Sequence, residues 1–184
     1  GQFESALDQD NLDKIRDTAL GYGNYLKQHQ PGETISVYRA ALEHVPNDRD
    51  LMKELLESLG EDSNEEERAK LLEKMIAFES EENVPSAVLK AAELYELLDD
   101  GNGVLRVLSL GFKRAPSNDE IRKRLIEVYR ARGDNTGLAE LLIHSAENQP
   151  VNETKLSMLQ EAAQIYLNSL SDPQSAARIL RQVI

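Results

Sequence analysis

The sequence predicts an all-α fold in which short helices form a row of antiparallel hairpins. A tyrosine or leucine recurs at intervals of 34, 36, 34 and 37 residues, at Tyr25, Leu59, Tyr95, Tyr129 and Tyr166. Three prolines keep the same register, each 21 residues after the tyrosine of its own unit, at Pro46, Pro116 and Pro150. Leucine and alanine supply most of the apolar residues and aromatic residues make up only 5%, which favours helices packed on helices over β-sheets. A unit of about 34 residues is long enough for two short helices, so each unit is interpreted as one hairpin.

The unit from Asn118 to Pro150 shows the pattern most clearly. Apolar residues of its first helix share one face, at Ile121, Leu125, Ile126 and Tyr129. Gly133 and Asp134 then indicate a helix end, because glycine readily adopts the left-handed conformation found there. The second helix carries Leu138, Leu141, Leu142 and Ala146 before the proline closes the unit. We expect Tyr129 to be largely buried between neighbouring hairpins.

The first pair is expected as a helix at about 13–28 and a second helix between Pro31 and Pro46. Residues 1–12 can be interpreted in two ways, either as the end of an earlier repeat or as the turn and start of one. Gly21 and Gly23 fall inside the first helix, where a glycine costs about 1 kcal/mol relative to alanine. Close packing of helices explains both glycines better than phosphate binding does.

Helix starts are indicated by side chains that can cap them. The segments 63–66 and 117–120 both begin with serine and end with glutamate, the spacing of a capping box in which each side chain satisfies a backbone donor. Asp172 precedes Pro173. This order predicts an aspartate N-cap with proline at the first helical position, where its missing N–H costs nothing.

Together the pairs resemble a tetratricopeptide repeat (TPR) array, whose marks are an aromatic late in the first helix, a Gly-Asp turn and a proline after the second helix. The resemblance covers nearly the whole chain as a single array, residues 1–184. Residues 1–12 are interpreted as the remnant of an upstream repeat, and the pairs are expected at about 13–46, 48–79, 84–116, 118–150 and 153–184. The resemblance implies a right-handed α-solenoid whose first helices line an inner surface. The TPR pattern has a small residue three positions before the recurring aromatic residue, but this chain has Tyr22, Leu56 and Ile126 there. The curvature of the solenoid is therefore left open. Both ends of the chain look like boundaries inside a longer protein.

The formal net charge of −12 disfavours binding to nucleic acid or to an anionic membrane. Residues 61–82 hold nine acids and three bases, and this run is interpreted either as a solvated face or as a docking patch for a basic partner. The chain has no cysteine, so disulfides and zinc-thiolate sites are excluded. The sequence contains no run of about 18 apolar residues, so we predict no membrane span. The compartment is left open, with the cytoplasm slightly favoured over bacterial export.

We predict no catalytic, cofactor or metal site, and no enzyme activity. The three histidines, His29, His44 and His144, are far apart, and none has a second histidine three or four residues away. No phosphate-binding, dinucleotide-binding or nucleophile motif occurs. The paired acids lie in polar stretches, whereas general acid catalysis needs a desolvated carboxyl group.

The resemblance implies a non-catalytic protein–protein interaction scaffold that holds a peptide or helix of a partner in its concave groove. The alternative is a regulatory or spacer repeat array of a larger enzyme or signalling protein. The candidate groove residues lie on the solvent-facing side of the first helices: Lys53, Glu57, Ser86, Glu93, Lys123, Glu127, Arg130, Gln160 and Gln164. Some TPR proteins bind the acidic C-termini of chaperones with Lys, Arg and Asn on this surface, but Glu57, Glu93 and Glu127 do not support that role here. We also expect the final helix to expose Ile179, Leu180 and Val183, which would allow end-to-end self-association.

Overall fold

The computed structural model describes residues 2–60, 64–147, 150 and 152–181. Over these residues the fold contains α-helices and one short 3-10 helix, and no strand. The elements in chain order are α1 (Gln2–His29), α2 (Pro31–His44), α3 (Arg49–Leu59), α4 (Glu65–Met75), η1 (Ile76–Phe78), α5 (Val84–Leu97), α6 (Gly101–Arg114), α7 (Asp119–Arg132), α8 (Asn135–Glu147), α9 (Glu153–Asn168) and α10 (Pro173–Leu180).

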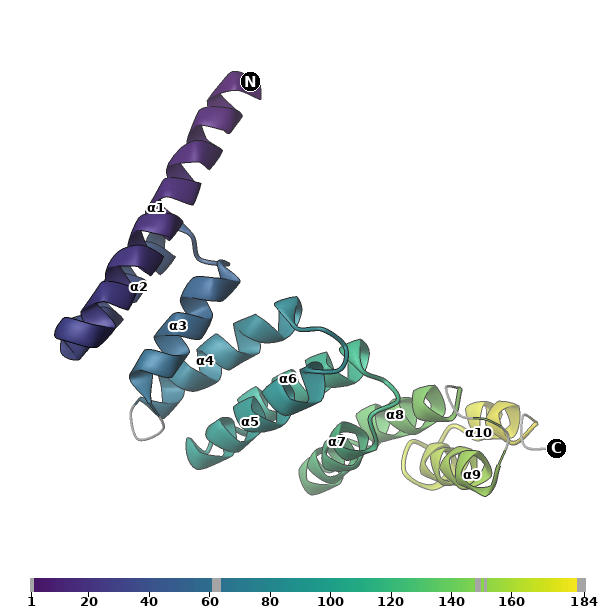
Figure 1. Cartoon of the computed structure of the whole chain (residues 1–184). Coiled ribbons are helices and arrows are strands. Elements are labelled where there is room, and N and C mark those ends of the chain that lie inside the picture. The colour runs from purple at the N-terminus through teal and green to yellow at the C-terminus, as the bar shows by residue number, and fades with distance from the viewer. Residues whose placement is uncertain (1, 61–63, 148–149, 151, 182–184) are drawn as a thin grey trace.

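The helices form a row of hairpins that runs from one end of the molecule to the other (Figure 1). Each odd-numbered helix packs on the even-numbered helix that follows it, and each even-numbered helix packs in turn on the next odd-numbered helix. The helices α3, α5, α7 and α9 begin 35, 35 and 34 residues apart. The predicted all-α solenoid of antiparallel hairpins is therefore confirmed.

Helix α1 differs from the prediction, because it begins at Gln2 and not near Asp13. Its N-terminal end projects away from the other helices (Figure 1). Within α1, Gly23 lies directly against the ring of Tyr38, so close packing accounts for that glycine. Nothing lies within 4 Å of the position that a Cβ at Gly21 would take. The packing explanation is therefore wrong for Gly21.

Asparagine or aspartate caps the start of seven helices in the described part of the chain. In each case the side-chain oxygen accepts a hydrogen bond from the backbone N–H three residues later, at 2.9 to 3.2 Å, and the capping residues are Asp48, Asn64, Asp100, Asn118, Asp134, Asn152 and Asp172. The predicted cap at Asp172 is confirmed. The two predicted serine caps are corrected by one residue to Asn64 and Asn118, since asparagine is at least as good an N-cap as serine. Ser63 itself lies outside the described residues.

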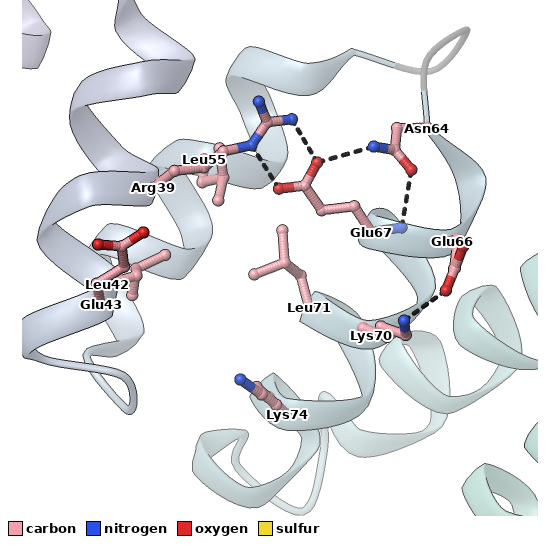
Figure 2. Close-up of a pocket in the computed structure, with 10 residues that line it drawn as sticks. All are labelled: Arg39, Leu42, Glu43, Leu55, Asn64, Glu66, Glu67, Lys70, Leu71 and Lys74. Carbon is pink, nitrogen blue, oxygen red and sulfur yellow. Dashed lines mark hydrogen bonds and ion pairs between the residues drawn. The ribbon is translucent and has the colours of Figure 1, made fainter.

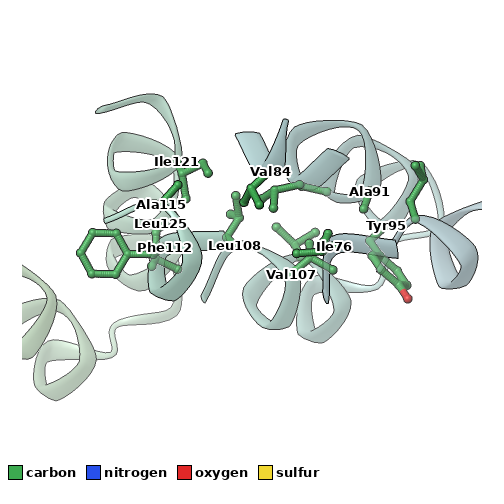
Figure 3. Close-up of a cluster of buried hydrophobic side chains, with 14 of the residues drawn as sticks. Ile76, Val84, Ala91, Tyr95, Val107, Leu108, Phe112, Ala115, Ile121 and Leu125 are labelled. Atoms are coloured by element: carbon green, nitrogen blue, oxygen red, sulfur yellow. The ribbon is translucent and has the colours of Figure 1, made fainter. Parts of the chain in front are cut away.

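The apolar core is continuous along the row. Its largest cluster joins α4 to α8 and contains Ile76, Val84, Leu108 and Ile121, all of them almost fully buried (Figure 3). A second cluster lies among α1 to α4, and a third among α7 to α10. Each hairpin thus buries its apolar side chains mainly against its neighbours, as in other solenoids.

Two predictions about buried side chains need correction. Tyr129 contacts both the first and the third core cluster, so it does lie between hairpins, but it is only partly buried. In the last helix Ile179 is buried, at 3% exposure, because it packs on the third cluster. Leu180 is 42% exposed, as predicted, and Val183 lies outside the described residues.

Candidate functional site

The array has two unlike sides. Helix α1 contacts α3, and α5 contacts α7, whereas consecutive even-numbered helices contact one another less over the described residues. We call the exposed surface of α3, α5, α7 and α9 the odd-helix face.

All of the predicted groove residues are exposed on this face. The structure brings two of them together, because Glu57 of α3 and Glu93 of α5 line the same pocket. Lys53 lies beside Glu57, with Nζ 4.0 Å from Oε1, and Arg130 pairs with Glu161 at 2.6 Å. The remaining members do not line that pocket: Ser86, Lys123, Glu127, Gln160 and Gln164.

The pocket between α3 and α5, with α4 behind it, has a volume of about 520 Å³. Its lining combines leucines with charged side chains: Leu56, Glu57, Gly60, Arg68, Leu72, Lys90, Glu93, Leu94 and Leu97. Leu97 is 77% exposed, the highest value for a large apolar side chain among the described residues. We call this site the α3/α5 pocket. Sequence reasoning missed its leucines, although the Leu97-Leu98 pair after Tyr95 was a signal, since it extends the apolar stripe beyond the core.

At the other junctions between consecutive odd-numbered helices an ion pair crosses the gap. Lys27 of α1 pairs with Glu54 of α3 and lies 3.6 Å from Glu57. Glu96 of α5 pairs with Arg124 of α7 at 2.5 Å. The pair between Arg130 and Glu161 joins α7 to α9 in the same way.

These junction pairs share one register within the repeat. In each pair, one partner lies one or two residues after the recurring tyrosine or leucine of its own unit. The other partner lies five residues before the recurring tyrosine or leucine of the next unit. At the α3/α5 junction the first position is Gly60 or Glu61, and the second is Lys90. Gly60 and Lys90 line the α3/α5 pocket, and Glu61 lies outside the described residues. None of the described charged side chains of α3 pairs with one of α5.

The backbone explains why glycine stands at position 60. Gly60 ends α3 with φ 68° and ψ −177°, a conformation that is accessible essentially only to glycine. A residue with a side chain at this position would strain the turn.

The even-numbered side carries a second pocket, of about 460 Å³, between α2 and α4 (Figure 2). Its floor contains three leucines, Leu42, Leu55 and Leu71. On its rim Arg39 donates two hydrogen bonds, at 2.7 and 2.6 Å, to the carboxylate of Glu67. This bidentate pair already satisfies both groups.

The acidic run of residues 61–82 is largely built into such pairs. Besides Glu67, Glu66 pairs with Lys70 at 2.5 Å and Glu79 lies 3.5 Å from Arg49. Residues 61–63 lie outside the described residues. Bases therefore compensate Glu66, Glu67, Glu73 and Glu79. The exposed acids Glu65, Glu81 and Glu82 form no ion pair with the described residues, so the docking-patch interpretation stays open for them.

Glu73 of α4, Tyr95 of α5 and Arg106 of α6 form a hydrogen-bonded trio in which the pKa of each side chain is shifted. Glu73 accepts hydrogen bonds from the hydroxyl of Tyr95 at 2.6 Å and from Arg106 at 2.5 and 2.9 Å. Burial and the hydrogen bond to Glu73 raise the pKa of Tyr95 to about 12. Burial alone would raise the pKa of Glu73, but the bonds from Arg106 and Tyr95 outweigh it and lower that pKa. Both shifts favour the hydrogen-bonded state, so the trio stabilises the stack of hairpins.

Two of the three histidines contact aromatic rings. The ring of His29 stacks on Tyr25 at 4.1 Å, and the ring of His144 meets the edge of Phe112 at 5.6 Å. Over the described part of the chain, no group of three or more histidine, aspartate or glutamate side chains is placed to hold a metal ion. Within the same part, every helix is too short or too polar to span a membrane.

No protein-family model matches the chain, and none of the curated proteins matches it. Among similar solved structures, a MamA protein is 13% identical, with 93% of this chain and 91% of that chain covered and a TM-score of 0.45. Naa15/Naa10 bound to HypK-THB is 14% identical, with 94% of this chain but 24% of the other covered and a TM-score of 0.49. A putative kinesin light chain of nearly identical TPR-like repeats from Podosopora anserina is 18% identical, with 94% and 93% covered and a TM-score of 0.39. At these identities and TM-scores the likeness does not assign this chain to a family.

Proposed function

We propose that this TPR-like array is a non-catalytic protein-interaction scaffold, and that its odd-helix face binds a peptide or helix of a partner protein. The observation that carries the proposal is the α3/α5 pocket. It contains Leu97, which at 77% exposure is the most exposed large apolar side chain of the described residues. An exposed apolar pocket rimmed by charged residues is typical of a protein-interaction site.

The position of the pocket within the row supports the proposal. Junction pairs bridge the odd-helix face between α5 and α7 and between α7 and α9, and another junction pair links α1 to α3. At the α3/α5 junction α4 packs on α5, and the gap in front of α4 stays open. Its volume of about 520 Å³ falls within the range of ligand pockets in proteins. A side chain that entered it would be surrounded by three helices, and such desolvated contacts dominate binding energy.

The test is selection of binders from a displayed random peptide library on the chain, followed by affinity measurement on substituted chains. Leu97→Glu should weaken the selected peptides by at least about tenfold, because a charge would enter the apolar pocket. Leu167→Glu is the matched control, since Leu167 is also an exposed leucine, at 54%, on another odd-numbered helix and outside the pocket. Equal melting curves for both variants would show that folding is unchanged.

The proposal is wrong if the library yields no binder, or if the binders are insensitive to Leu97→Glu. The first result would favour the regulatory or spacer role, which no observation on the described residues supports so far. The second would mean that peptides bind elsewhere on the array.

A further inference from the structure

We infer that the chain associates head to tail, with α10 of one copy packed in a groove between α1 and α2 of the next copy. Helix α1 lies at one end of the row and α10 at the other (Figure 1). The inference goes beyond the proposed function, because the surfaces that it uses lie at these two ends and outside the α3/α5 pocket. It follows from comparing the end helices with the same repeat positions inside the row.

Each hairpin inside the row packs on the hairpins before and after it through neighbouring residues of its even-numbered helix. In α4, Leu71 belongs to the second core cluster, which includes α1 to α3, and Leu72 belongs to the first cluster with α5. In α8, Leu141 belongs to the first cluster and Leu142 to the third. These leucines stand seven and eight residues after the capping residue of their helix. The seventh residue therefore faces the preceding hairpin, and the eighth faces the following one.

In α10 the forward-facing residue is uncovered. Leu180 is the eighth residue after the capping Asp172. Its equivalents Leu72, Leu108 and Leu142 are 8%, 0% and 2% exposed, whereas Leu180 is 42% exposed. Helix α10 thus presents to solvent the apolar position that α4, α6 and α8 bury in the next hairpin.

The complementary face is open at the other end of the row. A groove of about 390 Å³ is lined by residues of α1 and α2 alone, among them Ile15, Ala19, Tyr22, Val37 and Ala41. We call it the α1/α2 groove. Val37 is the seventh residue after the N-cap of α2, which is the position that faces a preceding hairpin elsewhere in the row. The groove is therefore the surface on which an even-numbered helix packs at the internal junctions.

Tyr22 shows how far this face is uncovered. Near the end of α1, Leu26 is buried, with 2% exposure, and Tyr22 stands four residues before it. In α3, α5, α7 and α9 the residue four positions before the recurring tyrosine or leucine is at most 2% exposed: Leu55, Ala91, Leu125 and Ala162. Tyr22 is 53% exposed. A helix seated in the α1/α2 groove would cover it.

The charges at the two ends identify α10 as the helix that fits. The bidentate pair between Arg39 of α2 and Glu67 of α4 joins the ninth residue after one N-cap to the third residue after the other. Arg181 and Glu33 stand at the same two positions, nine residues after the N-cap of α10 and three after that of α2. Both are exposed, and neither forms an ion pair with the described side chains. Head-to-tail packing would place Arg181 opposite Glu33 of the next copy.

The two surfaces of this contact differ, so every added copy leaves one free end of each kind and the assembly stays open. Sedimentation of the chain should show a mean mass that rises with concentration beyond that of a dimer. Leu180→Glu and Tyr22→Glu should each weaken association by at least about tenfold, because each places a charge in an apolar junction. Phe78→Glu, at an exposed apolar residue in the middle of the row, is the matched control and should change it by less than about twofold.

Mixing the two end variants tests the head-to-tail arrangement directly. The Leu180→Glu chain keeps its groove and the Tyr22→Glu chain keeps its α10, so an equal mixture should form dimers and nothing larger. Glu33→Arg and Arg181→Glu should each weaken association by at least about fivefold, and the chain with both changes should recover to within about twofold. Since Glu33 and Arg181 are exposed, this charge exchange also decides the question if a variant of Tyr22 or Leu180 fails to fold.

Three results would overturn the inference: a chain that stays monomeric as its concentration rises, association that is insensitive to both Leu180→Glu and Arg181→Glu, or a mixture of the end variants that stays monomeric. The last result would point to a symmetric contact of α10 with α10. A double charge variant that associates no better than the single ones would contradict the placement of Arg181 opposite Glu33. Each of these outcomes leaves peptide binding at the α3/α5 pocket unaffected.

Discussion

The ring of Tyr95 lies directly against Gly103, on the helix that follows it in the same hairpin. Tyr129 lies against Gly137 with the same spacing of eight residues. In both hairpins an aspartate in the turn, Asp100 or Asp134, accepts a hydrogen bond from the glycine N–H. Each glycine thus has two roles. Its N–H binds the capping aspartate at the helix start, and its lack of a Cβ lets the tyrosine ring pack directly on the backbone.

Gly103→Ala should therefore lower the free energy of unfolding by about 1 to 3 kcal/mol, the usual cost of overpacking a filled site. Tyr95 is 3% exposed and its hydroxyl is bonded to Glu73, so the ring has little room to move. The control is Gly21→Ala, where the new methyl group meets nothing and the change should add about 0.5 to 1 kcal/mol through helix propensity. Urea unfolding of the two variants measures both effects, and equal signs would contradict the packing argument.

Stability at alkaline pH should depend on Tyr95. Its pKa is raised to about 12 in the folded chain, whereas an unfolded tyrosine has a pKa of about 10. The neutral phenol is favoured by folding, so its contribution is complete below about pH 10 and is lost as the pH rises towards 12. A gap of two pKa units corresponds to about 2 to 3 kcal/mol.

Urea unfolding of the unsubstituted chain and of Tyr95→Phe between pH 9 and 12 would measure this contribution. The free-energy difference between the two chains should shrink across that range. A difference that stays constant with pH would show that the phenol titrates alike in the folded and unfolded states. General repulsion at high pH affects both chains and cancels in the comparison.

The junction pair between Glu96 and Arg124 can be measured by a double-mutant cycle. The side chains are 51% and 22% exposed, so water and salt screen them and the coupling should be about 0.2 to 1 kcal/mol. It should decrease as salt is added. A coupling near zero would mean that junction pairs mark the register of the helices without stabilising it.

The repeat period predicted the class of the fold because every hairpin must bury the same face against its neighbours. The period misassigned the first unit, where Tyr25 is 56% exposed. There the tyrosine–glycine contact is reversed, since Gly23 belongs to the first helix and Tyr38 to the second. In the first unit the glycine and the tyrosine of this contact have exchanged helices, so the buried tyrosine occupies another position of the repeat. A search for tyrosines at a fixed spacing therefore does not find it.

The candidate site was predictable in part. Exposure of Glu57 and Glu93 follows from the helical pattern, because each lies opposite the apolar stripe of its helix. The pocket between them depends on how far α3 and α5 stand apart, which the pattern of one helix does not contain. The ion pairs between consecutive odd-numbered helices depend on the same separations, so the repeat pattern did not predict them.

The corrected helix caps give a test in which neighbouring residues act as each other's control. The Oδ1 of Asn118 accepts the backbone N–H of Ile121 at 3.0 Å, so Asn118→Ala should cost about 1 kcal/mol. Ser117, one residue earlier and exposed, should tolerate Ser117→Ala within about 0.5 kcal/mol. Urea unfolding distinguishes Asn118 from Ser117 as the cap of α7, because removing the capping side chain leaves one backbone N–H without a hydrogen-bond acceptor. A larger loss for Ser117→Ala than for Asn118→Ala would restore the serine capping box and move the start of α7 back by one residue.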